Sequence, residues 1–149
     1  MTTLVVDASV AAQWLVPDNN TAEALQILQL VPFLIAPELL LAEVANTLWK
    51  RVQRGELSRT EGEALITAFL TIPVDIYPHI PLLPLAWNIA TATGITIYDS
   101  LYVALANTKQ APLITADKRL HAQASALSHY AQLLWIADVP HQLGEGSDV

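Results

Sequence analysis

Short apolar, β-prone segments alternate along this chain with longer segments that have helical periodicity. The expected strands cover residues 4–6, 33–36, 74–77, 113–115 and 133–136. The expected helices between them cover residues 9–15, 21–30, 38–54, 58–71, 82–93, 99–109 and 117–125. Strands that alternate with helices form parallel sheets covered on both faces. We therefore expect an α/β fold with three layers, α/β/α, around a central parallel sheet of about five strands.

Local signals mark where several of these helices begin and end. Ser58 and Glu61 have the spacing of a capping box, which should open the helix that follows them. Gly55 should stop the helix before it, and Gly94 should be the residue just past the helix 82–93. Residues 17–20, Pro-Asp-Asn-Asn, separate the first two helices.

The length and composition of the chain limit what it can be. A chain of 149 residues is most simply one domain. We expect this domain to span residues 1–143, followed by a flexible tail at 144–149. The apolar content of 53% is enough for a substantial core. The mean hydropathy is also high, so we expect the surplus apolar surface to contact a partner or a second copy.

The sequence gives no sign of a membrane protein or of disulfides. Its longest apolar stretch, residues 31–44, is interrupted by two prolines and two glutamates, whereas a span needs about 18 uninterrupted apolar residues. The first residues lack the basic region of a secretory signal. There are no cysteines, which excludes disulfides and thiolate metal sites. We expect a cytoplasmic protein that does not enter a membrane.

The net charge of −7 argues mildly against a nucleic-acid ligand, because phosphate contacts depend on lysine and arginine. The distribution of the charges weakens that argument. Four of the seven basic residues lie between positions 50 and 59, and Lys118 and Arg119 form a second pair beside Asp117. If acidic residues bind metal ions, the rest of the chain is much less negative. The charge therefore does not exclude such a ligand.

Four carboxylates occupy positions where an open parallel sheet places its ligand site. Asp7 follows the first strand, Asp117 follows the strand 113–115, and Asp99 opens a helix that is apolar nearly all round. Ligands of such sheets bind at the carboxyl ends of the strands, so we expect these acids at one edge. Each of them, taken alone, also suits an ordinary role as a helix cap or first-turn acid.

Glu43, the fourth acid, lies on a narrow polar stripe of the helix 38–54. At about 100° per residue, Lys50 and Arg54 fall roughly 20° to either side of it. The opposite arc carries the apolar residues Leu41, Val44, Ala45, Leu48, Trp49 and Val52. The stripe could be an ordinary solvated face. One acid and two cations flanked by Asn46 would also suit a metal ion beside a phosphate.

Together, four neighbouring acids need protons or a cation. Two unit charges about 6 Å apart repel by roughly 3 kcal/mol at an effective dielectric near 20, so the six pairs together cost more than about 10 kcal/mol if all lie that close. That rivals the whole stability of a domain, roughly 5–15 kcal/mol. Because all these ligands are oxygens, the expected ion is hard, Mg²⁺ or Mn²⁺ rather than Zn²⁺.

Rival catalytic motifs are absent from the sequence. It has no glycine-rich phosphate loop, no Gly-x-Ser-x-Gly and no cysteine nucleophile. A haloacid-type phosphatase requires the motif Asp-x-Asp after its first strand, whereas this chain has Asp7-Ala8-Ser9. The four histidines lack metal-binding spacing, so surface or capping roles are expected. The four tryptophans are expected in the core or in an interface rather than as stacking platforms for bases.

Four segments of the chain resemble PIN domains of the VapC toxin type. These segments are Leu4 to Ser9, Pro37 to Asn46, Tyr98 to Ala106 and Thr115 to Leu120, and the resemblance extends over nearly the whole chain. It implies a PIN-like fold and a Mg²⁺- or Mn²⁺-dependent endoribonuclease that hydrolyses RNA phosphodiester bonds, the toxin of a type II toxin–antitoxin pair. It also implies a homodimer that a cognate VapB-like antitoxin inhibits. The alternative is a catalytically silent PIN-like module that binds a protein partner.

The resemblance also assigns roles by position. The family's acidic quartet corresponds to Asp7, Glu43, Asp99 and Asp117. The expected metal ligands among them are Asp7, Asp99 and Asp117. Accessory polar positions correspond to Ser9, Asn46 and Thr115, and the candidate phosphate contacts are Lys50, Arg54 and Lys118. A fifth acid, Asp138, follows the last strand. The number of metal ions, the RNA target and the antitoxin stay open.

Overall fold

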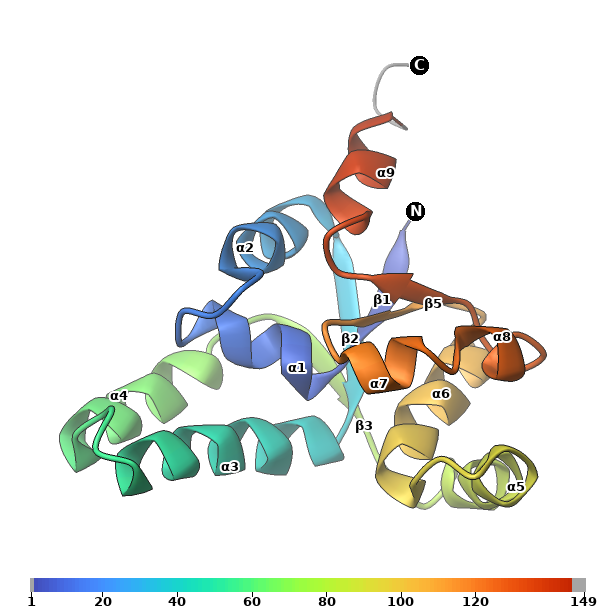
Figure 1. Cartoon of the computed structure of the whole chain (residues 1–149), viewed down its shortest axis with the longest axis horizontal. Coiled ribbons are helices and arrows are strands. Elements are labelled where there is room, and N and C mark those ends of the chain that lie inside the picture. The colour runs from blue at the N-terminus through green and yellow to red at the C-terminus, as the bar shows by residue number, and fades with distance from the viewer. Residues whose placement is uncertain (1, 146–149) are drawn as a thin grey trace.

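The structure is a computed structural model that describes residues 2–145 (Figure 1). Its five strands form one sheet in the order β3-β2-β1-β4-β5, and every pair of neighbours is parallel. The strands are β1 (Thr3–Val6), β2 (Phe33–Pro37), β3 (Val74–Tyr77), β4 (Leu113–Thr115) and β5 (Leu133–Trp135). The α/β fold with a five-stranded parallel sheet is therefore confirmed.

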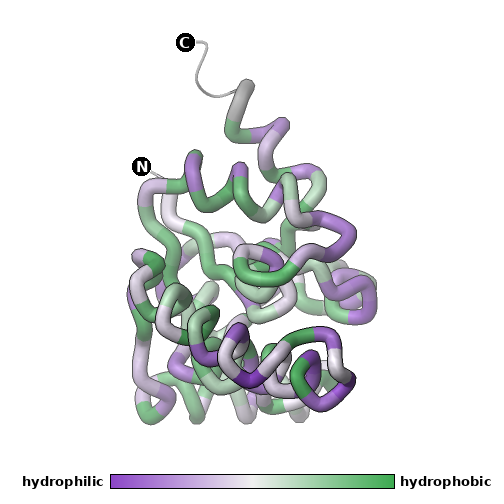
Figure 2. The backbone as a smooth tube through the Cα atoms, turned by 90° about the vertical axis from the view of Figure 1, so that its left-hand side faces the viewer, coloured by the Kyte–Doolittle hydropathy of each residue, from purple (hydrophilic) through white to green (hydrophobic). Residues whose placement is uncertain are grey.

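The first strand forms the centre of the sheet. Val5 pairs with Ile35 of β2 on one side and with Leu113 of β4 on the other. Residues 4–6 are buried. Strands of parallel sheets are covered on both faces, which explains why this segment is a continuous apolar run rather than an alternating one. In Figure 2 the coiled parts of the backbone alternate between hydrophobic and hydrophilic positions.

Helices connect successive strands and cover both faces of the sheet. The first two connections contain α1 (Ala8–Ala11), the 3₁₀ helix η1 (Ala12–Trp14), α2 (Thr21–Leu30), α3 (Leu39–Gln53) and α4 (Arg59–Phe69). The last two contain α5 (Leu83–Thr93), α6 (Ile97–Lys109), α7 (Lys118–His121) and α8 (Ala124–Leu127). Because parallel crossovers are right-handed, the first set lies on one face and the second on the other (Figure 1).

The central helix of the core is α6. Its residues 100–106 are all buried, and it contacts β1, β2 and β4 on one side and α5 on the other. A helix that is apolar all round is expected to be enclosed in this way. Within the described residues, no single helix is long and apolar enough to cross a membrane. Only α5 and α6 taken together reach that length, and they are bent by 117°.

Helix ends follow the local signals in the sequence. The Ser58 side chain accepts a hydrogen bond from the Glu61 amide at 3.0 Å, and the Glu61 carboxylate accepts one from the Ser58 amide at 3.1 Å. This confirms the predicted capping box. Gly94 follows α5 with φ +81°, the left-handed conformation expected just past a helix end.

Several element boundaries differ from those expected. The segment 9–15 is divided into α1 and η1, and the segment 117–125 into α7 and α8. A further helix, α9 (Val139–Glu145), was not predicted; it contacts α2. It takes in two residues of the expected tail, and residues 146–149 lie outside the described residues. Helix α6 begins at Ile97, capped by Thr96, so Asp99 lies within its first turn rather than at its start.

Candidate active site

The carboxyl ends of the central strands open into a hollow of about 380 Å³. Strand order reverses here, because the chain leaves β1 towards β2 and leaves β4 towards β5. Loops that diverge from such a switch point leave a crevice between them. Seven residues selected from the sequence line the hollow: Asp7, Ser9, Glu43, Asn46, Lys50, Asp99 and Asp117. All four acids of the predicted quartet therefore meet in one place.

Asp7 lies at the base of this hollow, with only 6% of its surface exposed. Its two carboxylate oxygens accept hydrogen bonds from the hydroxyls of Ser9 at 2.5 Å and Thr115 at 2.6 Å. The Val10 amide donates a third, at 3.2 Å. Burial raises the pKa of Asp7 to about 6, against the lowering effect of these bonds, and repulsion from Asp99 adds to the rise. Asp7 is therefore poorly satisfied as a bare anion.

Two of the polar positions predicted from the sequence hold the loops on either side of Asp7. Thr115 is fully buried, and besides binding Asp7 its hydroxyl accepts the Asp117 amide at 3.0 Å. The Ser9 hydroxyl accepts the Ala116 amide at 2.9 Å. These bonds tie the end of β1 to the end of β4. Ser9 and Thr115 thus fix the relative positions of Asp7 and Asp117.

Glu43 is half-buried and projects from α3 towards the buried ring of Tyr102 on α6. The Tyr102 hydroxyl donates a hydrogen bond of 2.7 Å to a Glu43 carboxylate oxygen. Burial raises the pKa of Glu43; the bond from Tyr102 opposes that rise, and repulsion from Asp99 adds to it. Burial, together with the nearby Glu43 charge, also raises the pKa of the Tyr102 hydroxyl, so this hydroxyl stays a donor.

Asp99 stands between the other acids. Its pKa is raised by burial first and then by the charge of Asp117, while the Arg119 guanidinium and the Thr96 hydroxyl lower it. Asp117 caps α7, because one of its oxygens accepts the amides of Arg119 at 2.9 Å and Leu120 at 3.3 Å. Asp7 caps α1 through Val10 in the same manner. The capping role and a place in the acidic hollow are therefore compatible.

Four of the residues selected from the sequence lie outside the hollow's lining: Thr115, which is buried behind Asp7, and Arg54, Lys118 and Asp138. Arg54 lies on the same face of α3 as Glu43 but is eleven residues further along, a rise of about 16 Å. It is therefore too far from the acids to line the hollow. Lys118 is exposed on α7 and lines neither the hollow nor its rim. Asp138 is exposed beyond β5, where its amide donates to the Trp135 carbonyl at 3.0 Å. On α3, Leu41 and Trp49 are also exposed rather than buried as the wheel indicates.

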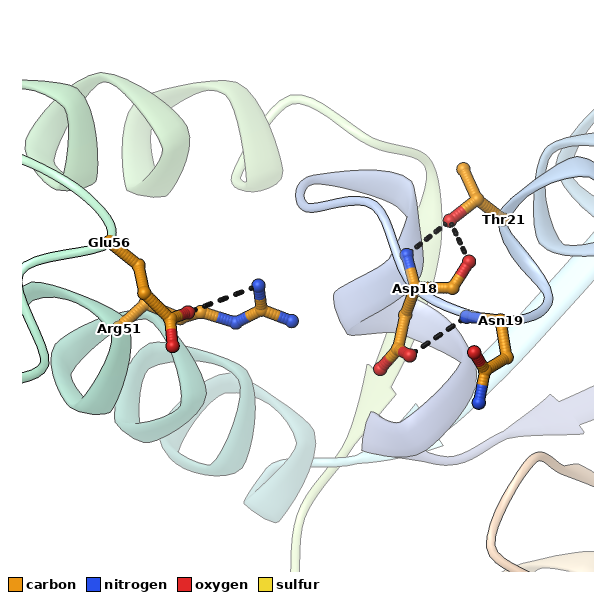
Figure 3. A network of polar contacts seen from close by, with 5 residues as sticks. All are labelled: Asp18, Asn19, Thr21, Arg51 and Glu56. Atoms are coloured by element: carbon orange, nitrogen blue, oxygen red, sulfur yellow. Dashed lines mark hydrogen bonds and ion pairs between the residues drawn. The ribbon is translucent and has the colours of Figure 1, made fainter.

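Other lining residues were missed in the sequence. Tyr102 follows Asp99 by three residues, which places both on one helix face and could have been noticed. Arg51 lines the hollow beside Lys50 and forms an ion pair of 3.3 Å with Glu56. Figure 3 shows its guanidinium extended towards the loop of Asp18, whose side chain accepts the Asn19 amide. Arg51 and Asp18 come from different segments that meet only in the fold, so no local sequence pattern indicates that they line the same hollow.

The donor set suits a divalent cation by its chemistry. Asp7, Asp99 and Asp117 offer only oxygen atoms, and the pKa values of Asp7 and Asp99 are raised by burial and by neighbouring acids. A hard cation relieves both penalties. Within residues 2–145, no three His, Cys, Asp or Glu side chains are already grouped so that they could hold an ion. The site therefore fits a metal by charge and ligand type, not as a preformed cage.

Comparison with known proteins decides the family. The family model described as the PIN domain matches residues 4–126. The chain belongs to the PIN domain family. Ribonuclease VapC3 from Pyrobaculum aerophilum is 36% identical over 128 residues, which cover 83% of this chain and 96% of that protein. This confirms the family expected from the four sequence segments.

Solved structures agree on the fold of this PIN domain. The crystal structure of PAE2754 from Pyrobaculum aerophilum is similar with a TM-score of 0.73 and 20% identity, over 97% of this chain and 90% of that one. The structure of VapBC2 from Rickettsia felis bound to a DNA fragment from their promoter is similar with a TM-score of 0.64 and 13% identity. The match covers 90% of this chain and 98% of that one. Nucleases of the PIN domain family generally depend on divalent metals, which agrees with the oxygen-only donor set of this one.

Proposed function

We propose that this protein is a Mg²⁺- or Mn²⁺-dependent endoribonuclease, the toxin of a type II toxin–antitoxin pair. One observation carries the proposal: four acids from distant segments line a single hollow that also holds Lys50 and Arg51. Acids that bind cations, next to cations that bind phosphate, suit hydrolysis of a phosphodiester. A relative that is 36% identical over most of the chain is named a ribonuclease, which makes RNA the favoured substrate.

In the proposed mechanism, Asp7, Asp99 and Asp117 would hold the metal. When bound, a divalent ion lowers the pKa of a water ligand and stabilises charge on the reacting phosphate. Ser9 and Thr115 keep Asp7 in place through the hydrogen bonds described above. The chain's own residues thus fix Asp7 before substrate arrives.

Glu43 would orient or deprotonate the attacking water. Burial raises the pKa of Glu43 towards neutral pH, and a general base is most effective when its pKa is near the working pH. The bond from Tyr102 fixes one carboxylate oxygen and leaves the other to act. Asn46, Lys50 and Arg51 lie on the same helix and would bind substrate phosphate oxygens. Arg54 and Lys118, outside the hollow, would contact phosphates farther along an RNA strand.

The assembly belongs to the same proposal. We propose one PIN-like domain over residues 1–143 that acts in the cytoplasm as a homodimer and is inhibited by a VapB-like antitoxin. The solved complex named VapBC2 supports this, because its fold is similar over 90% of the chain. Apolar side chains exposed on α3 and α5 offer surface for such contacts.

The test is cleavage of structured and unstructured RNAs by the purified protein in Mg²⁺, in Mn²⁺ and in EDTA. We expect cleavage in either metal and none in EDTA. Asp99→Asn should lower the rate by about 100-fold or more, because it removes a charged metal ligand. The matched control is Asp75→Asn, an exposed acid on β3, which should cleave at the wild-type rate.

Calorimetric titration with Mn²⁺ separates the proposal from its alternative. The nuclease should bind Mn²⁺ and gain thermal stability, about 2.7 kcal/mol at an ion concentration 100 times Kd. A wild-type protein that takes up no Mn²⁺ and cleaves no RNA would instead be a catalytically silent, partner-binding PIN-like module.

A further inference from the structure

A smaller hollow of about 230 Å³ lies beside the acid-lined one and shares Asp99 with it. Besides Asp99, it is lined by Gly94, Ile95, Thr96, Arg119, Leu120 and Gln123. The loop between α5 and α6 forms one wall. Helix α7 and the residues that follow it form the other. A ligand bound at Asp99 therefore borders both hollows.

The side chains around this smaller hollow match the parts of a nucleotide. Ile95, which is half-buried, supplies apolar surface on which the face of a base can rest, with the buried Leu120 beneath the hollow. Thr96 and Gln123 supply a hydroxyl and an amide, which can bind the polar edge of a base. At the rim, no atom lies within 4 Å of where a Cβ on Gly94 would stand, so this side is open.

Arg119 supplies the cation that a nucleotide phosphate requires. Its guanidinium lies close enough to Asp99 to hold down the pKa of that carboxyl. The ion pairs in the described part of the chain join Arg51 to Glu56 and Arg59 to Glu63, and neither involves Arg119. Exposed and outside these ion pairs, Arg119 keeps its fork of donors available for a phosphate.

Cations therefore stand on both sides of the acids. Lys50 and Arg51 belong to the larger hollow, and Arg119 belongs to the smaller one. An endonuclease needs this arrangement, because the chain it cuts continues in both directions from the reacting phosphate. A strand whose reacting phosphate lies at Asp99 would meet α3 with one arm and α7 with the other.

We propose that the smaller hollow is the subsite for the RNA nucleotide next to the reacting phosphate, and that Arg119 binds the phosphate of that nucleotide. The proposal rests on the ribonuclease function proposed above. It adds where the RNA strand lies on the side of the reacting phosphate that faces α7. It also explains a net charge of −7 in an RNA-binding protein, since a few cations at the two hollows suffice.

A purely electrostatic role for Arg119 predicts different results. If Arg119 only adjusted the charge of Asp99, its removal would act through metal binding and would leave RNA affinity otherwise unchanged. Removing a cation beside Asp99 makes the ion site more negative, so Mn²⁺ should bind as tightly as before or more tightly. RNA binding should weaken at the same time, because a phosphate contact is lost. These opposite directions separate the two roles.

The experiment compares Arg119→Ala with Arg59→Ala, which removes an exposed arginine of α4. Cleavage kinetics are measured on a single-stranded RNA oligonucleotide that the wild type cuts, over a range of salt concentrations. Arg119→Ala should raise KM about tenfold with kcat changed less, because a charge-assisted hydrogen bond to a substrate phosphate is lost. The slope of log KM against log salt should fall by about 0.7, the value for one phosphate contact on a single strand.

Two further measurements complete the test. Calorimetry should give Arg119→Ala a Mn²⁺ affinity at least equal to that of the wild type, and Gln123→Ala should raise KM without changing Mn²⁺ affinity. If the wild type cleaves RNA while Arg119→Ala and Arg59→Ala have equal KM values, or if Arg119→Ala loses Mn²⁺ affinity, the subsite is disproved and the ribonuclease function stands. A wild type that cleaves no RNA would defeat the ribonuclease function and the subsite with it.

Discussion

At the scale of single residues, Asp7 is held where its ionised form is disfavoured. Burial raises its pKa from 3.8 to about 6 in the folded state. Because the folded protein then binds this proton more tightly than the unfolded chain, the free energy of unfolding falls as pH rises from about 4 to about 6 without metal. A shift of this size lowers the free energy of unfolding at neutral pH by about 3 kcal/mol. A bound cation would remove this destabilisation.

Asp7→Asn should therefore abolish cleavage and raise stability in metal-free buffer. At pH 7.5 in EDTA we expect a higher free energy of unfolding, by up to about 3 kcal/mol, because the buried charge is gone. Below about pH 3 the advantage should vanish, since Asp7 is then protonated in both the folded and the unfolded state. Urea denaturation at a series of pH values measures this. The control Asp75→Asn, at an exposed position of β3, should keep the pH dependence of the wild type. Equal pH dependence in Asp7→Asn and the wild type would contradict the explanation.

Tyr102→Phe removes the hydroxyl that binds Glu43 and little else. Because this bond lowers the pKa of Glu43, its loss should move the acidic limb of the pH–rate profile to higher pH. We expect kcat to fall by about tenfold at neutral pH, less than the roughly 10²–10⁴-fold effect of losing a general base altogether, with KM for RNA nearly unchanged. The control is Tyr130→Phe, on the loop before β5. A profile that coincides with the wild type would show that Tyr102 does not position Glu43.

The sequence predicted the acids of the site better than its cations. Asp7 and Asp117 follow strands, so fold topology alone brings them to one edge. The cations of α3 were harder to predict, because a helical wheel gives the direction of a side chain but not its distance along the helix. Arg54 shares the face of Glu43 yet lies too far along the helix, whereas Arg51, which was not selected, lines the hollow. Arg119 was seen only as part of a basic pair, because its place beside Asp99 depends on how α7 packs.

At the scale of elements, His79 fixes the start of the helix that carries Glu43. Its ring nitrogen Nε2 accepts the Leu39 amide at 2.9 Å, and its own amide donates to the Glu38 carboxylate at 2.9 Å. Helix α3 has no cap from its own N-terminal side chain, so this contact from the loop after β3 satisfies a donor that would otherwise be free. The capping role expected of the histidines is realised here by a residue 40 positions away.

His79→Ala should destabilise the protein by about 1 kcal/mol, the usual effect of losing a helix cap. Because α3 also carries Glu43 and Lys50, we expect a lower cleavage rate as well. Urea denaturation measures the stability, and His129→Ala, an exposed histidine before β5, should leave both quantities unchanged. If His79→Ala and His129→Ala have the same denaturation midpoint, the contact does not hold the helix.

Elements were predictable where sequence and environment agree. The central strands β1 and β4 follow from short apolar runs that are buried on both faces, whereas the edge strand β3 is partly exposed. The capping box located the start of α4. The start of α6 was missed because Thr96 and Asp99 are both good first-turn residues and only the backbone shows which one is the cap. Helix α9 depends on its contact with α2, a tertiary interaction that no local pattern records.

At the scale of the whole molecule, acidic and apolar surfaces are separated. The acids gather at the carboxyl ends of β1 and β4, whereas an uncharged groove on α5 is lined by Ile80, Leu83, Pro84, Trp87 and Asn88. Ile80 is 87% exposed and Trp87 is 61% exposed. Two copies of a chain with charge −7 repel each other, so they associate most easily through a face without charges. We therefore expect the homodimer to form through α5.

Trp87→Asp should convert the dimer to a monomer without unfolding it. A central tryptophan of an interface contributes about 2 kcal/mol or more, so the dimer should weaken by at least about 30-fold, and the added charges would repel each other across the two-fold axis. Sedimentation velocity over a range of concentrations measures this. Leu70→Asp, which changes an exposed apolar residue at the end of α4, is the control that should stay dimeric. A Trp87→Asp protein that remains dimeric would place the interface elsewhere.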